Sequence, residues 1–317
     1  MNRWDQARQL LRIGRRVETD GEHRARTFRA ETVDPERGPR PVRGRSLCVV
    51  SGKGGTGKST ITAALSDLLR REGRTLLVDA DLGCANAHIL HDVHPEHSFA
   101  NVIAGERAVS EIVTPCGQGL DLLAGGSGIG RLAELEDYEL DLIGRGLARI
   151  ESDYDFTLVD SAAGLSRQTV TFAAACDRTL LVTTPDVTAM TDAYAFLKVF
   201  VRLCALHGER RPLPWLVVNR AASVGEASEV AARLQDVTRK FLGQQLEVLG
   251  SLPDDRAVFR CTQRRCSVSA GEPGSDLGRA LARLGGELRD RLLAVDGAGV
   301  GARLSGMSRR PAEPRSA

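Results

Sequence analysis

The chain has 317 residues, of which 42% are hydrophobic and 26% charged, which is ordinary usage for a globular protein of one large domain. No apolar run reaches the ~18 residues of a membrane-spanning helix, the arginine-rich start does not resemble a signal peptide, and the seven cysteines show no disulfide-framework spacing. These features argue against an integral membrane protein and a disulfide-stapled secreted domain, and they predict a cytoplasmic protein.

The basic residues are concentrated at the beginning of the chain. Residues 1–45 hold twelve arginines and seven acids, a net charge of +5, whereas the net charge of the whole chain is +2. Residues 1–17 predict a short helix, because apolar side chains recur at helical spacing (Leu10, Ile13 and Val17). Residues 18–45 contain three prolines and no periodicity, which predicts a flexible linker. The basic arm suggests an acidic partner, anionic lipid or nucleic acid, although a solvated tail is the simpler interpretation of the linker.

From residue 46 onward, short apolar runs alternate with helical patterns. The expected strands are 47–51, 75–79, 120–124, 155–160, 178–183, 213–219 and 246–250, and the expected helices are 58–71, 137–151, 188–206, 225–242 and 276–294. Continuous apolar strands that alternate with helices predict an α/β fold with a doubly wound, mostly parallel sheet flanked by helices. We assign this domain to residues 46–295, and we expect residues 296–317, which show no pattern, to be disordered.

A glycine-rich loop joins the first expected strand to the first expected helix. Its residues are Gly52, Lys53, Gly54, Gly55, Thr56, Gly57, Lys58, Ser59 and Thr60. The spacing is that of a P-loop, in which backbone N–H groups and the helix dipole bind phosphate oxygens. Lys58 would reach the β- and γ-phosphates, and the Ser59 hydroxyl would ligate Mg²⁺. The sequence therefore predicts a site for ATP and Mg²⁺.

A second lysine, Lys53, stands near the start of the loop and gives it the deviant Walker-A form, in which the chain resembles the MinD/ParA family of ATPases. The resemblance implies an ATP-bridged homodimer in which Lys53 reaches the nucleotide of the opposite subunit and stabilises the transferring phosphoryl group, as an arginine finger does. It implies that Lys53 and Lys58 are catalytic and that slow, regulatory hydrolysis to ADP and phosphate opens the dimer. The alternative interpretation of Lys53 is a solvated surface lysine.

Three aspartates follow expected strands, at the edge where open α/β sheets bind ligands. The resemblance implies that Asp79 supports the Mg²⁺ shell through water, and that Asp81 positions the attacking water and so acts in catalysis. It implies that Asp160 holds Mg²⁺ through a water. Each aspartate taken alone could instead cap a helix.

The resemblance covers about residues 46–292 and includes the base site. Asn219 matches the asparagine that reads adenine, and Pro253 and Asp254 match the loop that borders the base. Several segments resemble more narrowly the FlhG group of flagellar regulators, namely residues 119–128, 183–198, 217–223, 241–243 and 249–255. In the second of these, Asp186 replaces the glutamate of that group.

The N-terminal helix also resembles this group. Asp5, Gln6, Ala7 and Leu10 match the start of its DQAxxLR helix, with the arginine displaced by one position to Arg12. In that group the helix stimulates the signal-recognition-type GTPase FlhF. The implied partners are thus a second copy of the chain, an FlhF-like GTPase, flagellar C-ring components and a flagellar transcriptional activator.

Other functions remain open at this level. A ParA-type partition ATPase would bind DNA non-specifically through surface arginines, with a steep salt dependence. A pure interaction module would act through residues 1–17 alone, and another MinD-like positioning ATPase would share the same fold. The FlhG-like helix makes DNA the less favoured partner.

Three further patterns have competing interpretations. Leucines form an apolar stripe flanked by arginines (Leu277, Leu281, Leu284, Leu288 and Leu292), which favours a packed final helix over weak contact with the inner face of a membrane. Histidines recur at every third residue (His88, His91, His94 and His97) and could bind zinc, but Pro95 interrupts the helix, which favours a polar surface or a pH-sensitive contact. Cys261 and Cys266 lack the close pair spacing of a zinc or iron–sulfur site.

Overall fold

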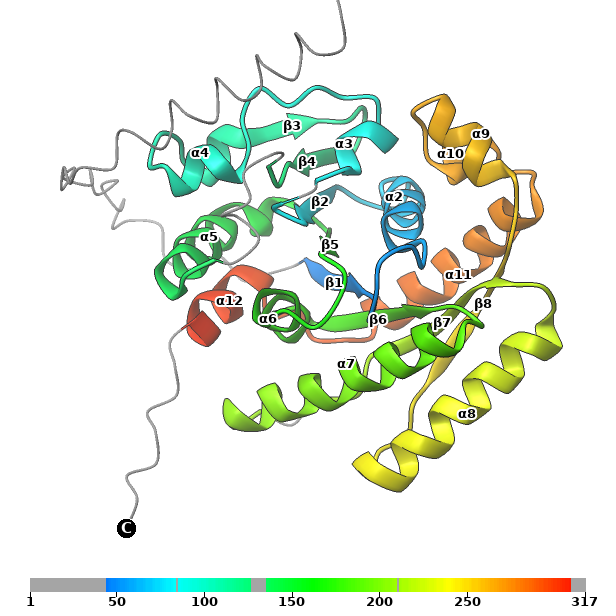
Figure 1. Cartoon of the computed structure of the whole chain (residues 1–317). Helices are drawn as coiled ribbons and strands as arrows, with labels where there is room; N and C mark the ends of the chain where they lie inside the picture. Colours follow the sequence, from blue (N-terminus) through cyan, green and yellow to red (C-terminus); the bar gives the residue numbers. More distant parts are fainter. Residues whose placement is uncertain (1–43, 84, 127–134, 210, 309–317) are drawn as a thin grey trace, which may run out of the picture. The chain divides into compact units, whose positions relative to one another are not determined.

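The computed structural model describes residues 44–83, 85–126, 135–209 and 211–308. Within these ranges the strands form one eight-stranded sheet in the order β3-β4-β2-β5-β1-β6-β7-β8, and all pairs are parallel except β3 with β4 (Figure 1). The strands are β1 (Arg45–Val50), β2 (Thr75–Ala80), β3 (Val113–Pro115), β4 (Leu120–Leu123), β5 (Phe156–Ser161), β6 (Arg178–Thr183), β7 (Trp215–Ala221) and β8 (Val248–Pro253). The predicted doubly wound, mostly parallel sheet is confirmed.

The connections between the strands are mainly helical. The helices are α2 (Lys58–Leu69), α3 (Ala87–Leu90), α4 (Phe99–Ile103), α5 (Asp137–Ile150), α6 (Arg167–Ala175), α7 (Val187–Leu206), α8 (Val224–Leu242), α9 (Ala257–Gln263), α10 (Val268–Gly271), α11 (Asp276–Leu293) and α12 (Val300–Ser308). Short 3₁₀ turns occur at Val109–Ile112 and Glu151–Asp153. The sequence did not predict β3, α3, α4, α6, α9, α10 or α12, which are too short for a clear periodic pattern.

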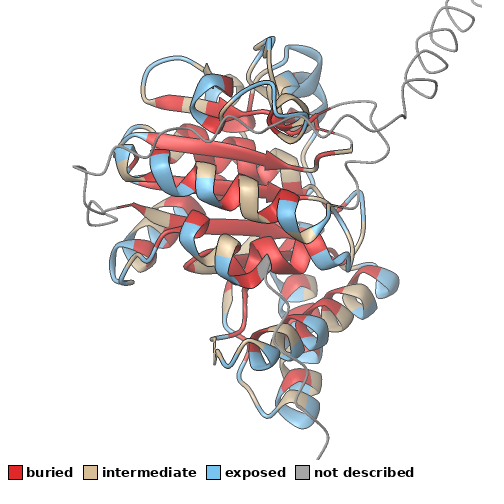
Figure 2. Cartoon of the chain, turned by 90° about the vertical axis from the view of Figure 1, so that its left-hand side faces the viewer, coloured by how far each residue is buried: buried red, intermediate tan, exposed pale blue. Residues whose placement is uncertain are grey.

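Two hydrophobic clusters cover the two faces of the sheet. In β1, Leu47 and Val49 belong to the cluster with α2, α9, α10 and α11, whereas Cys48 and Val50 belong to the cluster with α5, α6, α7, α8 and α12. This division follows from the two-residue period of a strand. Figure 2 shows that buried residues fill the strands and the sheet-facing sides of the helices. Helices therefore pack on both faces of the sheet, and the carboxyl ends of the parallel strands lie at one edge.

The leucine stripe of α11 lies inside the protein. Its five leucines are at most 5% exposed and pack against β-strands and α2. The predicted core packing is confirmed, and the buried leucines give no support to contact of this face with a membrane. None of the helices in the described part of the chain is long and apolar enough to cross a bilayer.

The end of the chain differs from the prediction of a disordered tail at 296–317. Residues Val300–Ser308 form α12, and Val300, Leu304 and Met307 are at most 4% exposed between α5 and α6. For residues 300–308 the prediction of disorder was wrong, because only three apolar residues stand among glycines and serines and give no clear helical pattern; residues 309–317 lie outside the described part of the chain. The predicted helix at 1–17 and nearly all of the predicted linker at 18–45 lie outside the described residues.

Candidate functional site

The P-loop lies between the end of β1 and the start of α2, at the middle of the sheet. Gly57 caps α2 with φ of 90°, a left-handed conformation that favours glycine. A Cβ atom on Gly57 would also lie 2.3 Å from the Asn219 amide nitrogen, and one on Gly52 would lie 2.3 Å from the Asp192 backbone. Both glycines therefore allow β7 and α7 to approach the loop closely.

The space over the loop suits a phosphate group. A Cβ on Gly54 or Gly55 would meet nothing within 4 Å, and the buried Thr56 hydroxyl has no hydrogen-bond partner among the described residues. Backbone N–H groups at a helix N-terminus are natural donors to phosphate oxygens. The predicted P-loop residues thus come together as an anion-binding loop.

Lys58 points toward the end of β5. Its Nζ lies 2.7 Å from Asp160 Oδ1 at the end of β5, and both side chains are at most 7% exposed. The hydroxyl of Thr62, one helical turn after Lys58, also donates to Asp160 Oδ1 at 3.2 Å. The sequence analysis missed Thr62, although its position four residues after Lys58 places it on the same face of α2.

Asp79 lies beside Asp160, since the two residues are paired in the register of β2 and β5. Burial, followed by the Asp160 carboxylate, raises the pKa of Asp79 to about 7. Its carboxylate accepts hydrogen bonds from the backbone N–H groups of Asn86 and Ala87 at 3.0 Å and of Asp81 at 3.2 Å. Asp79 therefore orders the segment that follows β2. The two carboxylates, with the Ser59 hydroxyl 3.4 Å from Lys58 Nζ, offer oxygen ligands of the kind that Mg²⁺ prefers.

Lys53 turns away from the loop toward the start of α7. Its Nζ lies 3.3 Å from Asp186 Oδ1 and donates a hydrogen bond to the Thr188 hydroxyl. Asp186 is also the N-cap of α7, because its Oδ1 accepts from the N–H groups of Thr188 and Ala189. The Thr188 hydroxyl also donates to Asp186 Oδ1, and this hydrogen bond, followed by those from the Ala189 N–H and Lys53, holds the pKa of Asp186 well below its usual range. Lys53 is thus tied to an exposed helix end rather than to the Lys58–Asp160 pair.

The predicted base-site residues lie at the ends of β7 and β8. The Asn219 amide donates to the Thr56 carbonyl at 2.7 Å, so this side chain joins β7 to the P-loop. Arg220, with φ of 57°, forms an ion pair with Asp254 at 3.5 Å, next to Pro253. The sequence analysis missed Arg220 because its left-handed backbone cannot be recognised from residue type alone.

This geometry agrees with the comparison with known proteins. Residues 47–268 match the model of the CobQ/CobB/MinD/ParA nucleotide binding domain. The chain belongs to the MinD/ParA family. It is similar to the antiactivator FleN of Pseudomonas aeruginosa, at 32% identity over 72% of this chain and 80% of the relative. It is also similar to the flagellum site-determining protein YlxH of Helicobacter pylori, at 30% identity over 78% and 82%.

Solved structures of MinD/ParA proteins have the same fold. The Pyrococcus furiosus cell division ATPase MinD superposes with a TM-score of 0.65 and 26% identity, over 78% of this chain and 99% of that protein. The predicted resemblance to the MinD/ParA family and to the FlhG group, to which FleN and YlxH belong, is confirmed.

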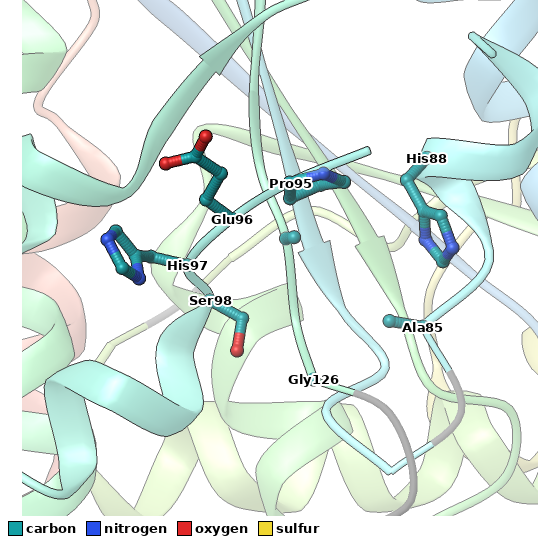
Figure 3. A pocket seen from close by; sticks show the side chains of 8 residues that line it. Ala85, His88, Pro95, Glu96, His97, Ser98 and Gly126 are labelled. Atoms are coloured by element: carbon teal, nitrogen blue, oxygen red, sulfur yellow. The ribbon is translucent and has the colours of Figure 1, made fainter. Parts of the chain in front are cut away.

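The histidine segment begins directly after Ala87, whose N–H donates to Asp79. His88 and His97 line an open pocket of about 150 Å³ on either side of Pro95 (Figure 3). The His91 side chain is only 4% exposed and lies 3.8 Å from Asp67, and burial lowers its pKa. Among the described residues, no three histidine, cysteine or acidic side chains are grouped closely enough to hold a metal. The zinc interpretation therefore has no support from this geometry.

Proposed function

We propose that this chain is an ATPase switch: ATP closes two copies into a dimer, and hydrolysis to ADP and phosphate separates them. The observation that carries the proposal is the different direction of the two P-loop lysines. Lys58 is buried against Asp160, whereas Lys53 extends to Asp186 at the exposed start of α7. A cation held outside its own phosphate loop is suited to act on the nucleotide of a second subunit. MinD from Pyrococcus horikoshii, which has the same fold, was solved with Mg-ADP.

The proposed catalytic roles follow from these positions. Lys58 exchanges Asp160 for the β- and γ-phosphates when ATP binds, because the phosphate oxygens offer more negative charge. Lys53 leaves Asp186 and neutralises the charge that develops on the partner's transferring phosphoryl group. Asp81, two residues beyond Asp79, orients the attacking water. We expect turnover to be slow, since each catalytic site needs a group from both subunits.

The remaining residues of the site hold the metal and the base. We assign Mg²⁺ to the Ser59 hydroxyl, with Asp79 and Asp160 in its outer shell; the ion would neutralise phosphate charge. Gly52 to Thr60 bind the phosphates through backbone N–H groups. Asn219, Pro253 and Asp254 border the adenine.

We further propose that the switch regulates the number or placement of flagella. The names of the two relatives support this: one is an antiactivator and the other a flagellum site-determining protein. By analogy we propose an FlhF-like GTPase as the partner of residues 1–17, through Asp5, Gln6, Ala7 and Leu10. Flagellar C-ring components and a flagellar transcriptional activator are the further proposed partners, with the ATP-closed dimer as the form that binds them.

Light scattering after size exclusion tests the switch. The wild-type chain should be monomeric with ADP and dimeric with ATP, Asp81→Ala should stay dimeric with ATP, and Lys53→Ala should be monomeric with both. Lys198→Ala is the matched control, because it removes an exposed lysine from α7 and should behave as wild type. A wild-type chain that stays monomeric with a non-hydrolysable ATP analogue would refute the proposal.

A synthetic peptide of residues 1–17 tests the partner. The peptide should raise GTP hydrolysis by an FlhF-like GTPase, and a scrambled peptide of the same composition should not. If the peptide is as effective as the whole chain with ATP, the ATPase domain localises the effector rather than controls it. Retention of DNA by the ATP-bound dimer, lost steeply as salt rises, would instead favour the partition function.

A further inference from the structure

The end of α9 brings two cysteines together. The N–H of Cys266 donates to the Cys261 carbonyl at 3.0 Å, and the N–H of Arg265 donates to the Thr262 carbonyl at 3.1 Å. With Arg265 in the left-handed conformation at φ of 51°, this is a complete Schellman motif. The motif places the side chains of its third-last helical residue and its second residue beyond the cap in contact. Here these residues are Cys261 and Cys266, so the four-residue spacing that fits no metal motif fits this turn.

The two sulfur atoms border the same small space. A Cβ on Gly271 would lie 2.5 Å from Cys266 Sγ and 3.0 Å from Cys261 Sγ. Both residues are free thiols. The absence of a side chain at Gly271 therefore leaves room for the paired sulfurs, and a Schellman turn keeps the two backbones as close as a disulfide requires.

The two thiols differ in access to solvent. Cys261 is 1% exposed, whereas Cys266 is partly exposed. Burial raises the pKa of the Cys261 thiol, while the Arg264 guanidinium lies 3.8 Å from its sulfur. An accessible thiol beside a sealed one has the arrangement of an attacking and a resolving cysteine. The described residues offer no third ligand that would make this pair a metal site.

We propose that Cys261 and Cys266 form a reversible disulfide, an oxidation site on the α9–α10 turn. The Cys266 thiolate attacks a hydroperoxide, whose O–O bond breaks to give a sulfenic acid and an alcohol. The Cys261 sulfur then attacks the sulfenic sulfur, the S–S bond forms, and the hydroxyl group leaves as water with the Cys261 proton. Two thiols and one hydroperoxide thus give one disulfide, one alcohol and one water, and a reducing compartment restores the thiols.

The turn is in contact with the helix of the P-loop. Ser267, the residue after Cys266, donates a hydrogen bond from its hydroxyl to Asp67 on α2. Arg265 forms an ion pair at 3.5 Å with Asp92, which follows α3. Asp67 also forms an ion pair with Arg70 at 3.0 Å, which holds its carboxylate in place on α2. Closing the disulfide therefore changes a segment that packs against α2, the helix that begins at the P-loop, and not a free surface loop.

Peptide mass spectrometry of the full chain tests the proposal. The protein is treated with hydrogen peroxide, free thiols are blocked with iodoacetamide, and trypsin is added without reductant. Trypsin cuts after Arg264 and Arg265, between the two cysteines, so the disulfide links peptide 261–264 to peptide 266–279 in one diagnostic mass. We expect this linked pair to appear with peroxide and to disappear with dithiothreitol. Its absence, with Cys266 blocked or oxidised to a sulfinic acid instead, would overturn the proposal.

Variants within the turn test whether the disulfide depends on the closeness of the two sulfurs or only on the reactivity of Cys266. Gly271→Ala keeps both thiols but inserts a methyl group between them, and it should lower the yield of the linked pair at least about threefold. Cys261→Ser should stop Cys266 at the sulfenic acid, which dimedone traps. Cys48 and Cys176 are the matched control, because they are also neighbours but are both 0% exposed and should stay reduced. Equal yields for Gly271→Ala and wild type would contradict the geometry proposed here.

Discussion

Gly54 in the P-loop and Gly301 in α12 have opposite uses. A Cβ on Gly54 in the P-loop would meet nothing within 4 Å, whereas one on Gly301 in α12 would lie 2.2 Å from the Ala148 nitrogen and 2.5 Å from the Gly144 carbonyl oxygen of α5. The first glycine leaves space that a ligand can enter, and the second lets two helices touch. The same residue type therefore marks a binding site in one region and a packing contact in the other.

The buried ion pairs of the two regions differ in the same way. Lys58 and Asp160 contact each other within the nucleotide site, so the pair can be exchanged for phosphate oxygens and Mg²⁺. Asp177, at 0% exposure, accepts hydrogen bonds from Ser46, from the N–H of Ala298 and from Arg303 at 2.9 Å. This second carboxylate joins the start of β1 to the α12 segment and has no ligand to exchange. The first pair belongs to the proposed ATP switch, whereas the second carboxylate holds two segments of the fold together.

The largest expected effect is the loss of stability when the Asp177 contacts are removed. Asp177→Ala leaves Ser46 and Arg303 without their partner, and we expect it to lower the free energy of unfolding by about 3–5 kcal/mol. Urea denaturation measures the change. The control Arg239→Ala removes an ion pair whose side chains are more than 70% exposed, and it should cost less than about 0.5 kcal/mol. Equal effects of the two substitutions would show that the Asp177 contacts do not support α12.

Two glycines of α12 should respond in opposite directions. Gly301→Ala inserts a methyl group into the α5 backbone and should lower the free energy of unfolding by about 1–3 kcal/mol. Gly306→Ala meets nothing within 4 Å and should be neutral or stabilising by up to about 1 kcal/mol, because alanine favours a helix. ATP turnover by the folded protein should stay unchanged in both. Destabilisation by Gly306→Ala as well would contradict the open space at this position.

Gly54→Ala should lower ATP turnover and leave the free energy of unfolding almost unchanged. Its Cβ occupies open space over the loop, and the residue does not lie in the left-handed region, so the free energy of unfolding should change by less than about 0.5 kcal/mol. The same methyl group obstructs the phosphates, and ATP turnover should fall about tenfold to 100-fold. Phosphate release and urea denaturation, measured together, check this separation. A variant that keeps full turnover would contradict the assignment of the loop.

The smallest expected effect is that of pH on Mg²⁺ binding, through the ionisation of Asp79. Because its pKa is about 7, Asp79 is mostly protonated at pH 6 and ionised at pH 8. A divalent cation favours the carboxylate, so the affinity for Mg²⁺ with a nucleotide should rise up to about tenfold over this range. Calorimetry checks the rise, and Asp79→Asn should flatten it.

The same titration makes a stability prediction of opposite sign. The folded state holds the Asp79 proton more tightly than the unfolded state, in which the pKa is near 3.8. The contribution of Asp79 to the free energy of unfolding therefore falls as the pH rises from about 4 through about 7. Without nucleotide, Asp79→Asn should be more stable than wild type at pH 8 and should differ little at pH 4. Equal stability of the two proteins at pH 8 would contradict the raised pKa.

The nucleotide site was largely predictable because its residues follow strands directly. Lys58 was located from the P-loop motif, and Asp79 and Asp160 from the resemblance to MinD/ParA ATPases and from their places at strand ends; the structure brings Lys58 and Asp160 into contact and pairs Asp79 with Asp160. The contacts of Asn219 and Lys53 were not predictable. The first joins the P-loop through a carbonyl, and the second pairs with a residue 133 positions later. Such long-range pairs depend on how the strands are ordered.

The sequence by itself determined the sheet, the P-loop and the final leucine-rich helix, because each has a local period or a fixed motif with a direct physical cause. Two other features, the formation of α12 and the pairing of two cysteines, depend on tertiary structure alone. Val300, Leu304 and Met307 are too few to form a stable helix in water, and α12 exists because α5 and α6 bury them. The pairing of Cys261 with Cys266 likewise requires a left-handed turn at Arg265, which no residue pattern of this chain predicts.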